Sequence, residues 1–260
     1  MFLVGARTEI LMQKLEHISV KVKRQDNTNS PSYWETFQLQ YRPYMNVITV
    51  LQDIRKNPRT FDGRLTSPIT WESSCLEEVC GTCTMVINGK VRQSCSTLVD
   101  SLGEQITIEP MTKFPVVRDL IVDRGILFKN LKRVKAWVPI DGTYALGAGP
   151  KMSPEDALMR YELSRCIACG CCMDACPQIN DRSDFVGAAV INQVRLFNSH
   201  PTGEVLKKDR LKALMGKGGI EDCGNAQNCV KACPKSIPLV TSIVEVNRQI
   251  TLNIFDLLKK

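Results

Sequence analysis

The residues of this chain that are best suited to chemistry are its cysteines. The 260-residue sequence has twelve of them, in three tight groups separated by long cysteine-free stretches. One group has the spacing C-x2-C-x2-C-x3-C-P, at Cys166, Cys169, Cys172, Cys176 and Pro177. Bacterial-type ferredoxins hold iron–sulfur clusters with this run, because short gaps in a tight turn point successive thiolates toward one cavity. The fourth cysteine of such a run ligates a second cluster, so a second run is expected elsewhere in the chain.

That second run follows with the same offsets, but one member is missing. Cys223, Cys229 and Cys233 match the first, third and fourth cysteines of the first run, and Pro234 follows the last of them. Ala226 stands where the second cysteine belongs. Its methyl group cannot ligate iron, so the two runs predict two unequal sites.

Each site combines the first cysteines of one run with the fourth cysteine of the other run, as in two-cluster ferredoxins. The four-thiolate site, for a 4Fe-4S cluster, comprises Cys166, Cys169, Cys172 and Cys233. The three-thiolate site comprises Cys176, Cys223 and Cys229. Because a cube corner without a protein ligand tends to lose its iron, we expect a 3Fe-4S cluster in the second site.

The remaining group of cysteines has a different spacing. Cys75, Cys80 and Cys83 form C-x4-C-x2-C, and Cys95 lies twelve positions further on. This is the pattern of plant-type ferredoxins, in which four cysteines hold a 2Fe-2S cluster. Asn88-Gly89 between Cys83 and Cys95 favours a type I′ hairpin turn, which would bring the fourth cysteine back to the loop.

Zinc is the main competitor of iron for paired cysteines. Against zinc, eleven of the twelve cysteines sort into the three ferredoxin patterns, and Cys171 alone is left over. We interpret Cys171 as a small thiol beside the 4Fe-4S cluster, with an exchange of roles between Cys171 and Cys172 as the alternative. The sequence shows no Ser/His/Asp set, no HExxH motif and no phosphate-binding loop, so no catalytic side chain is expected and the clusters are the chemistry.

Composition narrows the class of protein further. Clustered cysteines argue against a disulfide scaffold, the first twenty residues lack the apolar core of a signal peptide, and no apolar run is long enough to cross a bilayer. A reducing compartment is therefore expected. The formal charge of +7 falls to about +1 if each of three clusters contributes about two negative charges, which weakens the case for nucleic acid as a partner.

The first half of the chain has the pattern of a β-grasp domain. Residues 17–24 and 36–41 alternate between apolar and polar side chains, and the turn-forming segment 27–32 between them indicates a hairpin. A short helix is expected after Asn46, and residues 105–108 offer a last strand that Pro110 ends. This half is predicted to be a plant-type 2Fe-2S domain.

The second half is predicted to be helical. Apolar spacing indicates helices over 114–123, 126–137, 184–197 and 204–215, and one after Pro238. Ser153 followed by Pro154 marks the start of a further helix that leads to Cys166. The expected fold class is α+β, with a β-grasp 2Fe-2S domain in residues 1–124 and an all-helical two-cluster ferredoxin-like domain in residues 125–260.

Taken together, the order of the cysteine groups resembles the iron–sulfur subunit of succinate dehydrogenase and fumarate reductase. The likeness extends beyond the cysteines to Ser74-Cys75, Cys80-Gly81-Thr82-Cys83, Ile87-Asn88-Gly89, the segment 114–120 and Gln193-Val194-Arg195. The resemblance implies a relay of electrons from FAD in a flavoprotein subunit, through 2Fe-2S, 4Fe-4S and 3Fe-4S, to a quinone at a membrane-anchor subunit. Succinate and FAD would then bind the partner, and the complex would serve the respiratory chain and the tricarboxylic acid cycle.

One departure from the ubiquinone-using members of this family bears on the quinone. Those members carry a tryptophan shortly after the proline of the first helical motif, whereas here Pro177 is followed by Gln178-Ile179-Asn180. Gly224 likewise replaces a histidine of the second motif. The resemblance is therefore to menaquinone-linked bacterial enzymes with a dihaem cytochrome b anchor, with Pro177 and Gln178 as quinone-side contacts. It implies a peripheral protein on the cytoplasmic face of the bacterial plasma membrane.

Two other functions stay open at this stage. The chain could serve another flavoprotein oxidoreductase as its iron–sulfur subunit, which co-purification with a succinate-oxidising flavoprotein would decide. It could also be a zinc-stabilised interaction or nucleic-acid module, which the iron and sulfide content of the purified chain would decide. The direction of the reaction is not encoded in the cysteines, because succinate oxidation and fumarate reduction share the same relay.

Overall fold

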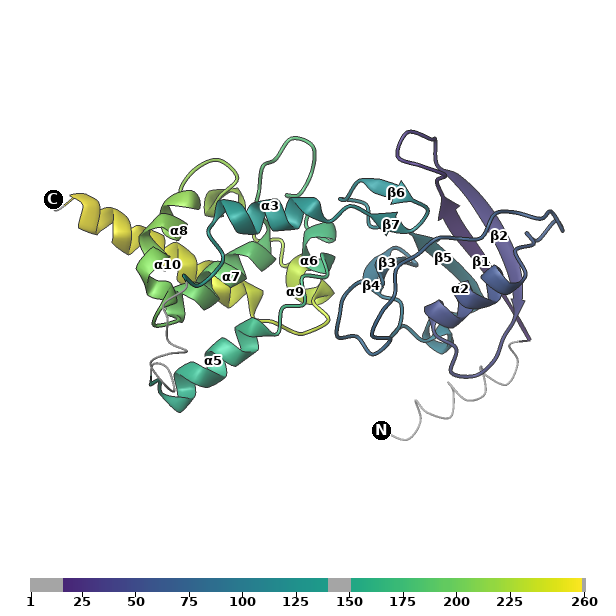
Figure 1. The fold of residues 1–260 in the computed structure, drawn as a ribbon, viewed down its shortest axis with the longest axis horizontal. Helices are drawn as coiled ribbons and strands as arrows, with labels where there is room; N and C mark the ends of the chain where they lie inside the picture. The colour runs from purple at the N-terminus through teal and green to yellow at the C-terminus, as the bar shows by residue number, and fades with distance from the viewer. Residues whose placement is uncertain (1–15, 140–150, 259–260) are drawn as a thin grey trace. The chain divides into compact units, whose positions relative to one another are not determined.

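The computed structural model describes residues 16–139 and 151–258, with side chains up to residue 254. It divides into two compact units, Met1–Asp123 and Arg124–Lys260, and each is described by itself (Figure 1). The expectation that no signal peptide is present concerns residues 1–20, most of which lie outside the described range. Among the described residues, no helix has both the length and the apolar character that a membrane crossing requires.

The first unit is built around a five-stranded mixed sheet in the order β2-β1-β5-β3-β4. Its elements are β1 (His17–Arg24), β2 (Tyr33–Gln40), α2 (Val47–Lys56), β3 (Thr84–Ile87), β4 (Lys90–Gln93), the 3-10 turn η1 (Val99–Ser101) and β5 (Gln105–Glu109). β1 and β2 form the expected hairpin, with His17 opposite Gln40, and β5 joins β1 in parallel. The hairpin, the helix and the parallel pairing at the centre of the sheet are the β-grasp arrangement that the sequence predicts.

Helix α2 packs on this sheet through its apolar face. The alternating Ile18, Val20 and Val22 of β1 are buried in the same core as Val50 and Ile54 of the helix. Burying each such side chain stabilises the fold by about 1.5–3 kcal/mol. The alternation of apolar residues in β1 and their helical spacing in α2 therefore decide which faces of the strand and the helix pack together. Asn46 caps the helix as expected, because its side-chain oxygen accepts a hydrogen bond of 2.9 Å from the Thr49 amide.

The segment 114–123 differs from the prediction. Instead of a helix it forms a small antiparallel pair, β6 (Val116–Arg118) and β7 (Ile121–Val122). Asp119 lies between them in the left-handed region, at φ 46°, where its carboxylate is fully buried. The apolar spacing of this segment fits a helix as well as a hairpin, and the contacts of Asp119 with residues distant in the sequence select the hairpin.

The second unit is helical, as predicted. Its elements are α3 (Gly125–Arg133), α5 (Pro154–Ser164), α6 (Cys171–Asp174), α7 (Ala188–Ser199), η2 (Gly203–Leu206), α8 (Lys207–Ala213), η3 (Ile220–Asp222), α9 (Asn228–Ala232) and α10 (Leu239–Leu258). Helix α7 is central and contacts α3, α5, α6, α8 and α10. Ser153 caps α5 by accepting a hydrogen bond of 3.1 Å from the Asp156 amide, and α5 ends two residues before Cys166.

The repeat that the cysteine spacing predicts is also a repeat of backbone conformation. Cys166 and Cys223 are 57 positions apart, and the same step carries Gly170, at φ 89°, onto Gln227, at φ 58°. It also carries the first residue of α6 onto Asn228, the first residue of α9. The two runs therefore fold alike, with a left-handed residue before each short helix.

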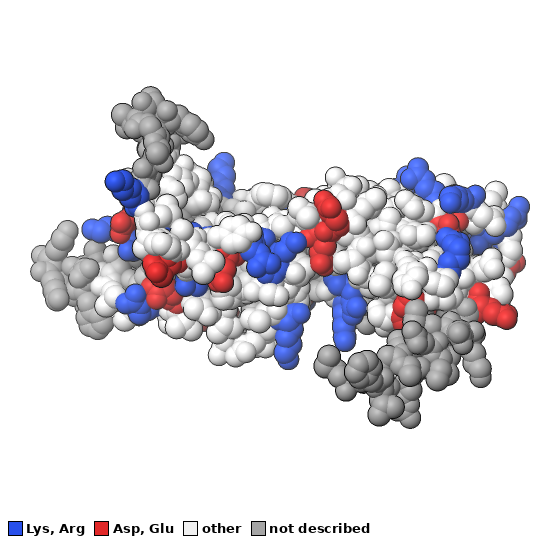
Figure 2. Space-filling model, turned by 90° about the horizontal axis from the view of Figure 1, so that it is seen from below, with Lys and Arg blue, Asp and Glu red and all other residues white. Residues whose placement is uncertain are grey.

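On the face shown in Figure 2, basic side chains lie interspersed with acidic ones. This mixed pattern is unlike the clustered Lys and Arg with which proteins track a phosphate backbone.

Candidate iron–sulfur sites

The first cysteine group converges as predicted. The β3–β4 hairpin turns at Asn88 and Gly89, at φ 47° and 72°, which fits the type I′ turn expected there. This return brings Cys95 to Cys83, with their sulfur atoms 3.4 Å apart and both side chains buried. Cys75 and Cys80 lie on the loop beside them and are half-buried.

The loop from Cys75 to Cys83 curls so that its amides face sulfur. The amides of Glu77, Val79 and Cys80 lie 3.5, 3.3 and 3.3 Å from Cys75 Sγ. The Glu78 amide donates to Cys95 Sγ at 3.3 Å. Leu76, Glu78 and Gly81 have positive φ values of 63°, 58° and 76°. Such turns direct successive N–H groups inward, as anion-binding backbone concavities do.

These donors favour thiolates, the form in which cysteine binds metal. Although burial opposes it, hydrogen bonds from Thr82 lower the pKa of the Cys80 thiol to about 6. Burial and the neighbouring Cys83 thiol raise the pKa of Cys95 to about 11. The site thus brings several cysteine side chains together, and their thiolate forms would repel one another. Backbone N–H groups surround their sulfur atoms. That combination fits a cationic iron cluster, which neutralises the thiolates that the loop gathers.

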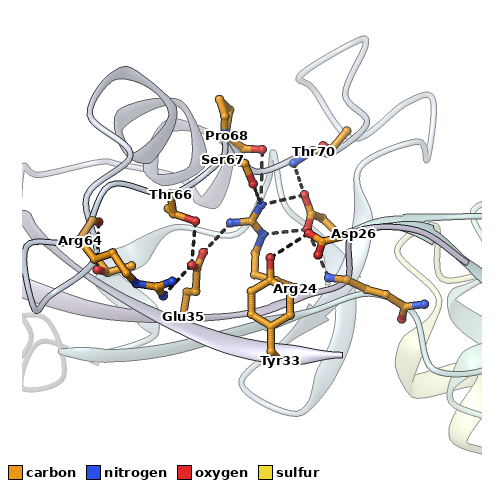
Figure 3. A network of polar contacts seen from close by, with 12 residues as sticks. Arg24, Asp26, Tyr33, Glu35, Arg64, Thr66, Ser67, Pro68 and Thr70 are labelled. Carbon is orange, nitrogen blue, oxygen red and sulfur yellow. Dashed lines mark hydrogen bonds and ion pairs between the residues drawn. The ribbon is translucent and has the colours of Figure 1, made fainter. Parts of the chain in front are cut away.

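A buried ion network anchors the chain segment that leads into this loop (Figure 3). Arg24 at the end of β1 contacts Asp119 at 2.7 Å and Glu35 at 2.6 Å, and also donates to Ser67 Oγ at 3.1 Å. Asp119 in turn accepts a hydrogen bond of 2.9 Å from the Thr70 amide. Thr70, five residues before Cys75, is therefore linked through Asp119 to Arg24 of the sheet. The sequence analysis did not identify this network, because its members are up to 95 positions apart.

In the second unit the cysteines of the two runs separate into two pockets. The cysteines that line one pocket are Cys166, Cys169, Cys171, Cys172 and Cys233. Burial raises the pKa of the Cys172 thiol, and repulsion from Cys169, Cys166 and Cys233 raises it further. The fourth cysteine of the second run thus lies with the first three of the first run. This is the crossed arrangement that the sequence predicts.

The other pocket holds the complementary set. The cysteines that line it are Cys176, Cys223 and Cys229. Burial and the proximity of Cys176 and Cys223 raise the pKa of the Cys229 thiol, while the Val230 amide lowers it. Ala226 lines the same pocket, so no fourth thiol is present among its lining residues. A three-thiolate donor set fits a cluster that lacks one iron corner.

Pro177 and Gln178 line this second pocket as well. The side chain of Gln178 lies against Gly224, where an added Cβ would come within 2.4 Å of Gln178 Nε2. Gln178 and Gly224, which follow the last cysteine of the first run and the first cysteine of the second, are therefore neighbours in space. A glutamine side chain fills the space that a larger residue at position 224 would need.

Two cysteines of the first of these pockets have further interactions that spacing alone did not reveal. The Cys171 side chain is hydrogen-bonded to Cys169, which is the main reason that the pKa of Cys169 falls to about 7. Burial raises the pKa of Cys166, against hydrogen bonds from the Ala168 amide and the Gln193 side chain. The sequence analysis singled out Gln193 as part of the segment Gln193-Val194-Arg195. It did not predict that this side chain would interact with Cys166.

A single metal ion is a different case from a cluster. Within residues 16–139 and 151–258, no three His, Cys, Asp or Glu side chains are grouped as ligands of one ion. His17 and His200 belong to none of the three cysteine groups: His17 begins β1, and His200 follows α7, where its ring accepts from the Thr202 amide at 3.2 Å.

Comparisons with known proteins agree with the two-unit fold. A domain family described as a 2Fe-2S iron-sulfur cluster binding domain matches residues 19–129, and one described as a 4Fe-4S dicluster domain matches residues 162–237. A chain of the Mycobacterium smegmatis Sdh1 complex in the apo form superposes with a TM-score of 0.76, covering 93% of this chain and 98% of that one. At 21% identity, that structure shows a shared fold.

Sequence relatives identify the family. The succinate dehydrogenase iron-sulfur subunit of Bacillus subtilis (strain 168) is 54% identical over 244 residues, which is 94% of this chain and 96% of the relative. The fumarate reductase iron-sulfur subunit of Wolinella succinogenes is 31% identical over 237 residues, 89% of this chain and 96% of the relative. The predicted fold class is confirmed, and so is the resemblance to the iron–sulfur subunits of succinate dehydrogenase and fumarate reductase. This chain belongs to the family of iron–sulfur subunits of succinate dehydrogenase and fumarate reductase, the electron-transfer subunits of these oxidoreductases.

Proposed function

We propose that this chain carries electrons between FAD in a flavoprotein partner and menaquinone at a membrane-anchor cytochrome b subunit. The electrons pass through 2Fe-2S, 4Fe-4S and 3Fe-4S centres, which supply the redox chemistry, while the chain holds and tunes them. The observation that carries the proposal is the separation of the second-unit cysteines into a pocket with a four-thiolate set and one with a three-thiolate set.

The ligand assignment follows from these pockets and from the first loop. In residues 1–124, Cys75, Cys80, Cys83 and Cys95 hold 2Fe-2S. In residues 125–260, Cys166, Cys169, Cys172 and Cys233 hold 4Fe-4S, and Cys176, Cys223 and Cys229 hold 3Fe-4S. The crossed lining of the two pockets supports this assignment, because Cys233 lies with the first run and Cys176 with the second.

The quinone end of the relay is assigned to the three-thiolate pocket. Pro177 and Gln178 follow its ligand Cys176 directly and line the pocket. Gln178 can donate and accept hydrogen bonds, which suits the carbonyl and hydroxyl forms of a quinone. The absence of tryptophan at positions 178–180 supports menaquinone as the quinone and a dihaem cytochrome b as the anchor. We propose that the complex lies on the cytoplasmic face of the plasma membrane, with this chain as a peripheral subunit.

The test is to purify the whole complex anaerobically and count iron. Two, four and three irons per cluster give about nine per chain of this subunit. The oxidised complex should also show the EPR signal of a three-iron centre. Succinate should reduce an artificial dye through the flavoprotein, and a menaquinone analogue through the complete relay. About four irons per chain, or bound zinc, would overturn the cluster assignment. If the co-purified flavoprotein does not oxidise succinate, the chain is instead the iron–sulfur subunit of another oxidoreductase.

A further inference from the structure

A buried side chain in the second unit links the chain segments that precede the first cysteine run and follow the second. Asn192 on α7 is fully buried. Its Nδ2 donates to the Leu163 carbonyl at 3.0 Å, and its Oδ1 accepts from Ser242 Oγ at 3.0 Å. These partners are 29 and 50 positions away in the sequence, so the bridge joins α7 to both α5 and α10.

The Leu163 end of this bridge lies three residues before Cys166. Leu163 is in the last turn of α5, where backbone carbonyls have no partner within the helix. Because Leu163 is fully buried, its carbonyl needs a partner from the protein, and the Asn192 amide supplies one. The chain is thus tied to α7 just before it enters the first run.

The Ser242 end of the bridge lies beyond Cys233, in the first turn of α10. Leu239, the first residue of that helix, lines the four-thiolate pocket together with Cys233. Ser242 is fully buried, and its hydroxyl also accepts a hydrogen bond of 3.4 Å from Arg195 of α7. The segment that leaves the second run is therefore tied to the same helix as the segment that enters the first.

The first turn of α7 borders both cysteine pockets. Ala188 lines the three-thiolate pocket, and Ala189 lines the four-thiolate pocket. Asn192 follows them by four and three positions, which places it on the same side of the helix, one turn further on. The bridge thus fixes the part of α7 that forms a wall of the four-thiolate pocket.

We propose that Asn192 is a positioning residue for the 4Fe-4S centre, which it serves by holding the segments beside Cys166 and Cys233 to one helix. The crossed ligand assignment, on which this inference rests, takes these two thiolates from different runs, so their spacing depends on packing. A side-chain amide suits the task because it supplies a donor and an acceptor together. An apolar side chain of similar size would leave a buried carbonyl and a buried hydroxyl unpaired, which favours local opening.

The experiment measures how fast the assembled complex loses each cluster to an iron chelator. Samples are withdrawn at intervals, fully reduced or oxidised, and followed by EPR. Ser242→Ala removes one of the two hydrogen bonds and should speed loss of 4Fe-4S about fivefold, because a buried hydrogen bond opposes local opening. Asn192→Leu removes both and should lose 4Fe-4S faster still. The EPR line of the remaining 4Fe-4S should broaden, because the ligand geometry becomes less uniform.

Two controls separate positioning from general stability. The 2Fe-2S and three-iron signals of the same samples should decay as in the unaltered complex, since the bridge ends lie beside ligands of the four-thiolate site. Asn198→Leu is the matched variant. Asn198 is a buried amide of α7 whose side chain bonds Gln249 of α10 and Arg210 of α8, each at 3.0 Å. It should lower the denaturant midpoint of the second unit without speeding loss of 4Fe-4S.

The outcomes distinguish this inference from the proposed function. Equal rates of 4Fe-4S loss in Asn192→Leu and Asn198→Leu overturn the positioning role, and so do equal losses of the 4Fe-4S and three-iron signals in Asn192→Leu. If Asn192→Leu does not assemble, an unchanged rate in Ser242→Ala overturns it. In each case an unaltered complex with about nine irons per chain leaves the proposed function in place. About four irons per chain in the unaltered complex would instead overturn the cluster assignment itself.

Discussion

Arg24 Nε and Asp119 Oδ1 lie 2.7 Å apart, and both side chains are fully buried. A second carboxylate, Glu35, contacts the same guanidinium at 2.6 Å and is itself approached at 3.1 Å by Arg64, which reaches in from solvent. Burial lowers the pKa of Arg24, but its hydrogen bond with Asp119 and the two carboxylates outweigh burial and raise it. The network is stable because every buried charge has a partner.

Removing one member should therefore destabilise the first unit strongly. Asp119→Ala leaves a buried guanidinium without its main partner, which typically costs about 3–5 kcal/mol in the free energy of unfolding. The loss is measured as an earlier denaturant midpoint of the 2Fe-2S circular dichroism signal of the assembled protein. Lys56→Ala is the matched control, because the 79% exposed Lys56 side chain pairs with Asp53 at the surface and should matter little. Equal midpoints for both variants would contradict the anchoring role of Asp119.

Ala226→Cys should convert the three-iron site into a four-iron site. The substitution restores the thiol that the repeat lacks, in a pocket that already holds Cys176, Cys223 and Cys229. Iron content should rise to about ten per chain, and the oxidised three-iron EPR signal should disappear. The added ligand charge should lower the potential of that centre and slow quinone reduction.

Ala226→Ser provides the control for this conversion, since a serine hydroxyl changes the size of the side chain without supplying a thiolate. Its three-iron signal should persist. If Ala226→Cys also keeps the three-iron signal and carries one titratable free thiol, residue 226 does not face the vacant corner of the cluster.

Gln178→Ala tests the quinone end of the relay. Because Gln178 lines the three-thiolate pocket beside Gly224, its loss should raise the KM for a menaquinone analogue several-fold and leave succinate-dependent dye reduction unchanged. Gln25→Ala is the control, because it removes a half-buried glutamine of the first unit that donates only to nearby backbone carbonyls through its side chain. A parallel loss of both activities would mean that Gln178 supports the fold and has no specific role toward the quinone.

Local patterns predicted most of the fold, and long-range contacts account for what they missed. The strand His17–Arg24 and the Asn46 cap are local features, in which side-chain period and capping chemistry suffice. The segment 114–123 is ambiguous locally, and Asp119 resolves it through Arg24, 95 positions away. Likewise, spacing predicted the crossed cysteine sets, but the contact of Gln193 with Cys166 depends on how α7 packs, which no local pattern encodes.

Tyr41 should make the first unit lose stability in alkaline solution. Its hydroxyl donates to Asp100 in a largely buried setting, and burial together with this hydrogen bond raises the pKa of Tyr41 to about 12. A phenol whose pKa is raised in the folded state contributes stability below its ordinary value of about 10, and this contribution is lost as pH rises from 10 toward 12. Tyr41→Phe leaves Asp100 without this donor and should cost about 1–3 kcal/mol at pH 8. The difference between the two proteins should shrink above pH 10, measured as denaturant midpoints of the 2Fe-2S signal from pH 8 to 10.5. A difference that stays constant over this range would show that Tyr41 does not titrate against folding.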